Sequence, residues 1–360
     1  MTVLSAHWHH DLLRLVAQEM LTRYDASVLP DIVVFMPNRR SCIAMREAFS
    51  ALRQETVLLP RIVPLAELES ELLLHAARQG SEISNIPPAM SRWQQRLLIT
   101  KLTRAFEKKR TAHLPSLSHA MALADDIIDI HADLLREGVD ITQVDIGKLA
   151  YGDSAAHSKS NAQFLDILFK QWPAITQEQG RISAAEREQR LLHAICESWK
   201  VSPPEHPVWV VGSTGSMHAV RTLMAQVHQM GGVVVLPALD DNASKAVAIG
   251  HPQYYLQASL QAMGVTQSDV QWLGEKGVTP RQALLVGQGS AGDGIELVQA
   301  AHEEEETGII ALMVREALET SDKTVAVITP SPALMQRVQL QLQRFGIHVS
   351  PPQGKPLGHT

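Results

Sequence analysis

Two runs of apolar residues, 208–211 and 233–236, form the clearest pattern in the chain. Small residues follow the first run, apolar positions spaced three and four apart come next, and Gly231-Gly232 precedes the second run. This order predicts a strand, a tight turn, an amphipathic helix, a glycine cap and a second strand. Because continuously apolar strands are typical of sheets covered by helices on both faces, the pattern indicates a βαβ unit with a right-handed crossover.

The first 64 residues show the same alternation of strand and helix patterns. The predicted elements are strands at 31–36 and 57–59, helices at 10–24 and 42–53, and a turn at 60–64. These two strands are too few for a complete sheet, and the strands that would occupy its centre are missing from the first 64 residues. We therefore expect the strand Ile32–Phe35 to pair in parallel with Val208–Val211, across roughly 170 intervening residues.

The middle of the chain has a different composition. Long amphipathic patterns without a convincing strand lie between proline-rich breaks at 81–88 and 201–207. The predicted helices are 92–108, 117–138, 161–180 and 184–200. We interpret this region as an α-helical domain inserted at 81–206 into an α/β domain that comprises residues 1–80 and 207–274.

The C-terminal part predicts a linker and a second α/β segment. The linker is the glycine-rich stretch 275–294, and residues 295–360 form the start of a second, incomplete α/β domain. Its predicted elements are strands at 295–298, 324–328 and 347–349 and helices at 303–320 and 332–345. Since so few strands do not complete a sheet, we expect the chain to be a fragment of a longer protein.

Composition restricts the possible functions. The 360 residues include 45% hydrophobic side chains and carry a net charge of −6, so any nucleic-acid contact must be local. Aromatic residues make up only 4% of the chain, which disfavours a stacking platform for single-stranded nucleic acid. Cys42 and Cys196 stand alone, which fits a reducing cytosol and gives no support for a disulfide or a cysteine metal site. Neither a signal peptide nor an apolar run of the ~20 residues of a membrane span is found.

The turn after residue 211 has two interpretations. It consists of five small residues, Gly212, Ser213, Thr214, Gly215 and Ser216. Backbone N–H groups at such a strand-to-helix turn can bind the phosphate of a nucleotide or of DNA. A P-loop, however, needs Lys and then Ser or Thr after its second glycine, and the glycine spacing also differs from a dinucleotide fingerprint. The alternative is a tight turn in which Ser or Thr caps the helix.

Two polar groups could suggest a metal site. One is a set of histidines near the N-terminus, His7, His9 and His10. They lack acidic or cysteine partners at ligand spacing, so we expect them to face solvent. The other is a set of acidic residues on one predicted helix, Asp125, Asp126 and Asp129, with His131 nearby. Carboxylates on one helix can hold a cation, but a solvated helix face is the simpler interpretation, and we predict no metal.

A third polar group consists of Asn38, Arg39 and Arg40, where a predicted strand leads into a helix. In open α/β folds, ligands bind at this carboxyl edge of the sheet. Two guanidinium groups and an amide beside a helix N-terminus can bind phosphate oxygens. A solvated turn is the competing interpretation. No pattern in the sequence nominates a nucleophile or a general base.

Several motifs, in collinear order, resemble one family of helicase-like proteins. Residues 33–52, VVFMPNRRSCIAMREAFSAL, resemble the motif of UvrD-type superfamily 1 helicases in which a strand ends in a turn that touches single-stranded DNA. Residues 324–349 resemble the strand and helix that open the second motor domain of those helicases. The segments LLPRIVPLAEL, VGSTGS, HPQY, ALMVREALE and GKPL together are similar to the AddB family, of the alphaproteobacterial type.

The resemblance implies a RecA-like α/β fold and a role in double-strand break repair. AddB subunits are helicase-like scaffolds that pair with AddA, the ATP-driven motor, and resect DNA ends for recombination. Their C-terminal part, which lies beyond the matched segments, carries a RecB-like nuclease and an iron–sulfur cluster. The resemblance therefore implies AddA and DNA as partners, DNA contacts at Asn38, Arg39 and Arg40, and no cofactor in this chain.

The departures from the helicase pattern agree with one another. The place of the Walker A loop reads SAHWHHDLL, without Gly-Lys-Thr. Gly212-Ser213 stands where an Asp-Glu pair would hold Mg²⁺, and Thr329-Pro330-Ser331 stands where an arginine would lie beside the phosphate. We therefore predict a helicase fold that cannot hydrolyse ATP. A nucleotide-binding α/β enzyme that uses the 212–216 turn is the alternative.

Overall fold

The computed structural model describes residues 2–8, 10–53, 58–65, 86–111, 115–140, 143, 155–240, 247–275, 296–321 and 323–349. The chain divides into two compact units, which are residues 1–277 and 278–360. We call them unit one and unit two and describe each by itself.

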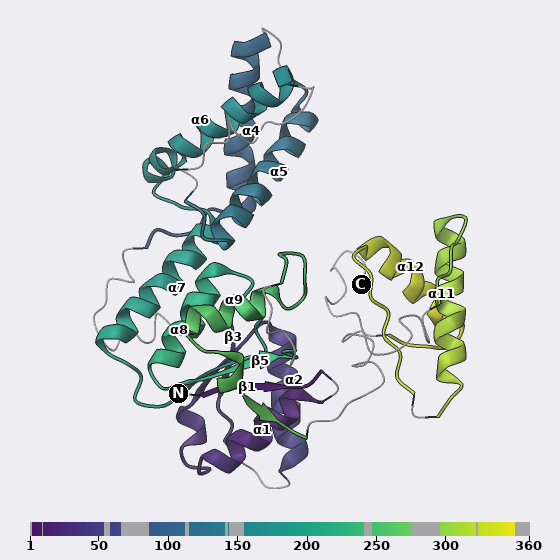
Figure 1. The fold of residues 1–360 in the computed structure, drawn as a ribbon. Coiled ribbons are helices and arrows are strands. Elements are labelled where there is room, and N and C mark those ends of the chain that lie inside the picture. The colour runs from purple at the N-terminus through teal and green to yellow at the C-terminus, as the bar shows by residue number, and fades with distance from the viewer. Residues whose placement is uncertain are drawn as a thin grey trace. The chain divides into compact units, whose positions relative to one another are not determined.

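Unit one is built on an all-parallel sheet (Figure 1). Its six strands within the described residues are β1 (Thr2–Ala6), β2 (Val33–Met36), β3 (Arg61–Pro64), β4 (Val208–Val211), β5 (Val233–Pro237) and β6 (Gln271–Leu273). Their order across the sheet is β3-β2-β4-β5-β1-β6, and every pair is parallel. This arrangement is consistent with a RecA-like fold and confirms the predicted parallel-sheet α/β class.

The predicted pairing of distant strands is confirmed. In the register of β2 and β4, Val33 lies opposite Val208, and Phe35 lies opposite Val210. The two strands after the helical region, β4 and β5, occupy the middle of the sheet. They are buried along almost their whole length, as their continuous apolar sequences require.

Helices cover both faces of the sheet because alternate strand side chains point to opposite sides. On one face, α1 (Leu12–Arg23) and α2 (Arg39–Leu52) pack with Val34, Trp209 and Val235. On the other, α7 (Ala184–Val201), α8 (His218–Gln229) and α9 (Tyr254–Met263) pack with Val210 and Val234. The helix α7, which the sequence assigns to the inserted helical region, therefore contributes directly to the core of the sheet layer.

Three further helices, α4 (Arg92–Thr111), α5 (Leu117–Arg136) and α6 (Ala155–Gln179), form a helical group with a core of its own. That core includes Ile99, Ile127 and Phe169. Short 3₁₀ turns elsewhere in the unit lie at Leu29–Asp31 and Gln267–Asp269. The helical group connects to the sheet layer through α7, which packs on both α5 and α8.

The three outer strands, β1, β3 and β6, differ from the sequence-based prediction. Residues 58–60 form no strand, and the segment that we predicted as a turn, 60–64, contains β3. The backbone N–H of Arg61 donates to the carbonyl of Ile32, which fixes the register of β3 beside β2. The strands β1 (TVLSA) and β6 (QWL) were missed because neither is a continuous apolar run. Their formation depends on neighbours, since β6 pairs only with β1 among the described strands.

Unit two contains α11 (Glu303–Leu318) and α12 (Pro332–Arg344) within its described residues. These helices match the predicted ones, including proline in the first turn of α12. The predicted strands are wrong for the described parts of those segments, because residues 296–298, 324–328 and 347–349 have no ladder partner. A strand gains its backbone hydrogen bonds from a neighbouring strand, so an apolar run alone does not form one.

We expect the backbone of unit two to exchange its amide hydrogens much faster than the sheet of unit one. Among the described residues, the buried hydrophobic cluster between α11 and α12 consists of Ala311, Val314, Val338 and Leu342, whereas Val233–Leu236 lies in the middle of a sheet covered on both faces. Hydrogen-exchange mass spectrometry of the chain checks this difference. Equal protection of residues 303–344 and 233–236 would contradict it.

Candidate functional site at the carboxyl edge of the sheet

All the turns that follow the strands meet at one edge of the sheet because every strand runs in the same direction. The segments at this edge begin after residues 6, 36, 64, 211, 237 and 273. In open parallel sheets this edge is where ligands bind. The structure therefore places the two candidate segments from the sequence, residues 38–40 and 212–216, on the same edge, after the neighbouring strands β2 and β4.

Asn38 is the N-terminal cap of α2. Its side-chain oxygen accepts hydrogen bonds from the backbone N–H of Ser41 at 2.9 Å and from the Ser41 hydroxyl at 3.1 Å. Arg39 and Arg40 are exposed and form the first two positions of the helix, not a turn as the sequence suggested. The first turn of α2 has no acidic residue. Two cationic side chains thus lie at the positive end of the helix dipole, which makes this end attractive to an anion.

The glycine-rich turn after β4 is braced by side chains from two helices. The carbonyl oxygens of Gly215 and Ser216 accept hydrogen bonds from Arg221 Nη1 at 2.7 and 3.0 Å. The carbonyl of Thr214 accepts one from the hydroxyl of Ser259 at 3.1 Å. Gly215 has a φ of +69°, and a Cβ at this position would lie 2.1 Å from Ser259 Oγ. Protein atoms therefore fill the side of the turn that faces α8 and α9.

The helix after this turn begins without a side-chain cap. Its N-cap is Met217, which makes no capping hydrogen bond, so the predicted serine or threonine cap is wrong. Ser213 instead accepts a hydrogen bond within the turn from the backbone N–H of Gly215, at 3.3 Å. The interactions that stabilise the turn come from Arg221 and Ser259, whose roles cannot be seen from local spacing.

Arg221 also connects the turn to the end of α5. Its Nη2 lies 4.0 Å from a carboxylate oxygen of Glu137, and its guanidinium carbon lies 5.7 Å from the centre of the Tyr255 ring. The hydroxyl of Tyr255 donates to the other oxygen of Glu137 at 3.0 Å, and this bond raises the pKa of Tyr255. Together, Glu137, Arg221 and Tyr255 join the helical group to the carboxyl edge of the sheet.

The segment after β1, where a nucleotide-binding loop would lie, contains packed histidines. His7 is buried and stacks on Trp272, with ring centres 4.5 Å apart, so the expectation that it faces solvent is wrong. His10 Nε2 lies 2.9 Å from the carbonyl oxygen of Glu275. His9 is outside the described residues. Among the residues that the structure describes, no three potential ligands are grouped so that they could hold a metal.

The acidic residues of α5 form ion pairs across the helical group. Asp125 pairs with Arg96 at 2.8 Å, and Asp129 pairs with Arg92 at 3.1 Å, while Asp126 is exposed. These pairs hold α5 to α4, so the carboxylates have a structural role. His131, on the same helix, is buried against Phe169 and Trp172, and burial lowers its pKa to about 4.

The helices of the described ranges do not combine the length and apolar character that a membrane span requires. No model of a known protein family matches the chain, and no curated protein matches its sequence. The features of the chain that bear on function are therefore the residues at the carboxyl edge of the sheet and the order of the sequence motifs.

Proposed function

We propose that this chain is a helicase-like scaffold without ATPase chemistry, the N-terminal part of an AddB-type repair subunit in the cytoplasm. In this role it binds the AddA motor and DNA during ATP-dependent resection of double-strand breaks. One observation carries the proposal. Exposed Arg39 and Arg40 open the helix after β2, while the two places where an NTPase would bind its nucleotide, after β1 and after β4, lack the required residues.

The contacts of the segments after β1 and after β4 support the proposal that the chain does not hydrolyse ATP. A P-loop needs a lysine that reaches the phosphates and a hydroxyl that binds Mg²⁺. The segment after β1 instead includes His7, which stacks on Trp272, and His10, which lies beside Glu275. The carbonyls of the turn after β4 accept hydrogen bonds from Arg221 and Ser259.

We expect the purified chain neither to bind nor to hydrolyse ATP in the presence of Mg²⁺, because it lacks the lysine and the acidic residue that this chemistry needs. Isothermal titration calorimetry and a phosphate-release assay measure the two properties. Binding with a micromolar dissociation constant would favour the alternative, a nucleotide-binding enzyme that uses Gly212–Ser216.

The positions of Asn38, Arg39 and Arg40 support the DNA contact. Each arginine side chain can donate two parallel hydrogen bonds to one phosphate. The amide NH₂ of Asn38 can donate to a further phosphate oxygen, because the N-terminal cap of α2 uses the side-chain oxygen of Asn38. The net charge of −6 opposes the approach of a polyanion to the isolated chain. The contact should therefore be strong only where the motor partner holds the DNA nearby.

We expect the double substitution Arg39→Ala and Arg40→Ala to weaken binding of single-stranded DNA by the complex with AddA. The loss of two phosphate contacts should also reduce the slope of log affinity against log salt by about 1.4, at ~0.7 per contact. Fluorescence anisotropy over a series of salt concentrations measures both effects. The melting temperature should change little, because both side chains are exposed.

A charge-matched control removes cations from the opposite edge. Arg53 is the C-terminal cap of α2, and Lys200 lies in the last turn of α7, so both positions lie away from the carboxyl ends of the strands. The variant Arg53→Ala with Lys200→Ala should keep the wild-type affinity and slope. If both double variants behaved alike, residues 38–40 would be a solvated helix end and not a DNA contact.

A further inference from the structure

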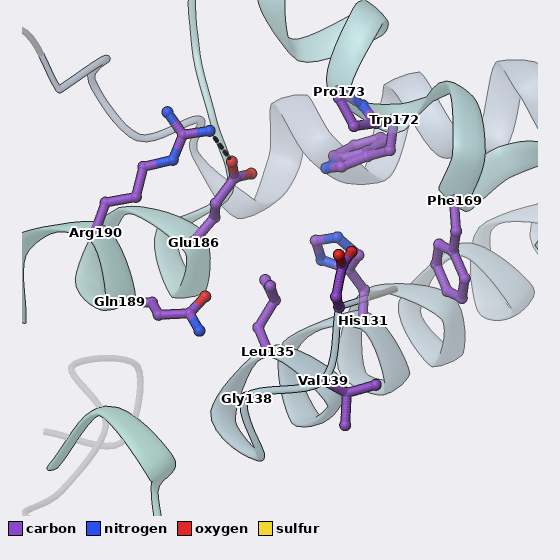
Figure 2. A pocket seen from close by; sticks show the side chains of 11 residues that line it. His131, Leu135, Gly138, Val139, Phe169, Trp172, Pro173, Glu186, Gln189 and Arg190 are labelled. Carbon is purple, nitrogen blue, oxygen red and sulfur yellow. Dashed lines mark hydrogen bonds and ion pairs between the residues drawn. The ribbon is translucent and has the colours of Figure 1, made fainter. Parts of the chain in front are cut away.

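The helical group has two features that the proposed function does not use. One is a cavity of about 330 Å³ where α5 and α6 meet α7 (Figure 2). In its lining, Glu186 and Arg190 pair with each other at 2.6 Å. The nitrogens of His131 and Trp172 that lack a hydrogen-bond partner are buried. None of these four side chains therefore selects a ligand. The other feature is the outer face of α4.

Five residues of α4, spaced three or four apart, lie on one face of the helix. They are Trp93, Leu97, Lys101, Arg104 and Lys108, and we call them the α4 stripe. Residues at this spacing are neighbours on a helix surface, so the stripe is continuous over about 22 Å of the helix axis. Trp93 is 62% exposed and Leu97 is 50% exposed. The two lysines are also exposed, and Arg104 is half-buried.

The cations of the stripe have no structural explanation in the fold. The sequence of α4 contains seven basic residues and one acidic residue. Arg92 and Arg96 pair with carboxylates of α5. Within the described part of the chain, the three cations of the stripe have no carboxylate partner. The helix dipole explains cations in the last turn only, whereas Lys101 and Arg104 lie about two turns or more before the end of α4 at Thr111. The stripe is thus a basic surface suited to an external anion.

The indole ring of Trp93 is supported on one face. The guanidinium carbon of Arg96 lies over the ring, 5.1 Å from its centre, and Arg96 is itself held by Asp125 at 2.8 Å. The large exposure of Trp93 leaves the other face of the ring accessible. Bases of a single strand stack on such rings, whereas bases of a duplex are already stacked on one another. The low aromatic content of the chain disfavours an extended stacking platform, but one ring is sufficient for one base.

We propose that the α4 stripe binds single-stranded DNA. Its three cations contact phosphates, and Trp93 stacks on a base. A stacked strand has one phosphate per about 3.4 Å, so the stripe spans about six nucleotides. An acidic protein segment would match the charges of the stripe but would give Trp93 no base to stack on. The inference rests on the proposed function, to which it adds a second DNA surface besides residues 38–40.

The cation contacts are tested on the full chain without AddA, at low ionic strength. The probe is a fluorescein-labelled oligothymidylate of about twelve nucleotides, which exceeds the span of the stripe. Fluorescence anisotropy at several salt concentrations should show that Lys101→Gln with Lys108→Gln binds roughly tenfold more weakly, with a slope reduced by about 1.4. The control variant Lys109→Gln with Lys200→Gln removes the same charge from exposed positions outside the stripe and should keep the wild-type slope.

The stacking contact has a separate readout. The unlabelled oligothymidylate should quench part of the tryptophan fluorescence, and Trp93→Phe should abolish that part. Trp8→Phe, at the other exposed tryptophan among the described residues, should retain it. Trp93→Ala should weaken binding of the labelled strand roughly tenfold, whereas Trp93→Phe should keep most of the affinity because its ring still stacks. Circular dichroism checks that the variants are folded.

The inference is overturned if the wild type does not bind the strand at low ionic strength, or if the lysine variant and Trp93→Ala bind it as the wild type does. It is also overturned if a duplex or polyglutamate binds as tightly as the single strand, because charge alone would then account for binding. The variant Arg39→Ala with Arg40→Ala separates the two DNA surfaces. If it keeps the affinity that the α4 variants lose, the contact at residues 38–40 fails and the stripe remains; the reverse result rejects the stripe and leaves the proposed function intact.

Discussion

Replacement of Gly232 by alanine is expected to destabilise unit one by about 3 kcal/mol or more, the upper end of the effects of overpacking. An added Cβ would lie 2.5 Å from the carbonyl oxygen of Val208 and 2.9 Å from that of Val227. It would also lie 2.7 Å from a methyl group of Val227. The two oxygens belong to backbone at the start of β4 and near the end of α8, so relief requires a shift of the central strand or of its covering helix.

The neighbouring glycine provides a matched control. Gly231 has a φ of +83°, and a Cβ there would have no atom within 4 Å. Gly231→Ala should therefore cost only the left-handed backbone penalty, about 1 kcal/mol. Urea denaturation, followed by circular dichroism, measures both variants. Equal losses in the two would mean that the space around Gly232 adjusts without cost.

The second large effect is an acid-induced loss of stability that depends on His131. Burial lowers the pKa of His131 from 6.5 to about 4, so the unfolded chain binds a proton at a higher pH than the folded chain does. Stability from this group is complete above pH 6.5 and decreases as the pH falls towards 4. By linkage, the loss amounts to at most about 3 kcal/mol.

The variant His131→Phe should remove this part of the pH dependence, because phenylalanine fills a similar space and cannot be protonated. Free energies of unfolding at a series of pH values between 4 and 7 measure the slope. His119→Phe, at an exposed position of the same helix, should keep the wild-type slope. If His131→Phe kept it as well, other groups would account for the acid sensitivity.

The centre of the fold could be predicted from the sequence because its signals are local and strong. The apolar runs of β2, β4 and β5 are each bounded by turn residues. Neither side of the helical region has enough strands to form a sheet alone, so strands from both sides must share one sheet. The parallel register of Val33 with Val208 follows from that argument. The helices α11 and α12 were equally clear, since they have acidic residues or proline at their start.

The outer strands could not be predicted because their stability comes from neighbours distant in sequence. Pro60 precedes β3 and Pro64 ends it, and these two prolines suggest a turn, yet the strand lies at the edge of the sheet where proline is tolerated. The reverse error occurred at 324–328, where an apolar run has no strand beside it among the described residues. Pattern alone does not reveal whether a partner exists.

The sequence was sufficient to locate the two segments of the candidate site, 38–40 and 212–216, but not the side chains that hold them in place. Asn38–Arg40 follows a strand, and the prediction that this segment lies at the carboxyl edge required only chain direction. The bracing of Gly215 by Arg221 and Ser259 depends on how α8 and α9 pack, which spacing does not encode. The burial of His131 has a weak signal, since it continues the apolar spacing of Ala124, Ile127 and Ile128.

The position of β4 also dictates the order in which the sheet can assemble during synthesis. Its neighbour β2 leaves the ribosome roughly 170 residues earlier, an interval of roughly ten to thirty seconds at usual rates of translation. During that time the open edge of β2 has no partner on the side that β4 will occupy. The helices of the intervening group make mostly local contacts and can fold in the meantime. Until Val211 emerges, the nascent chain therefore presents an unpaired strand edge, which is a template for pairing with another chain.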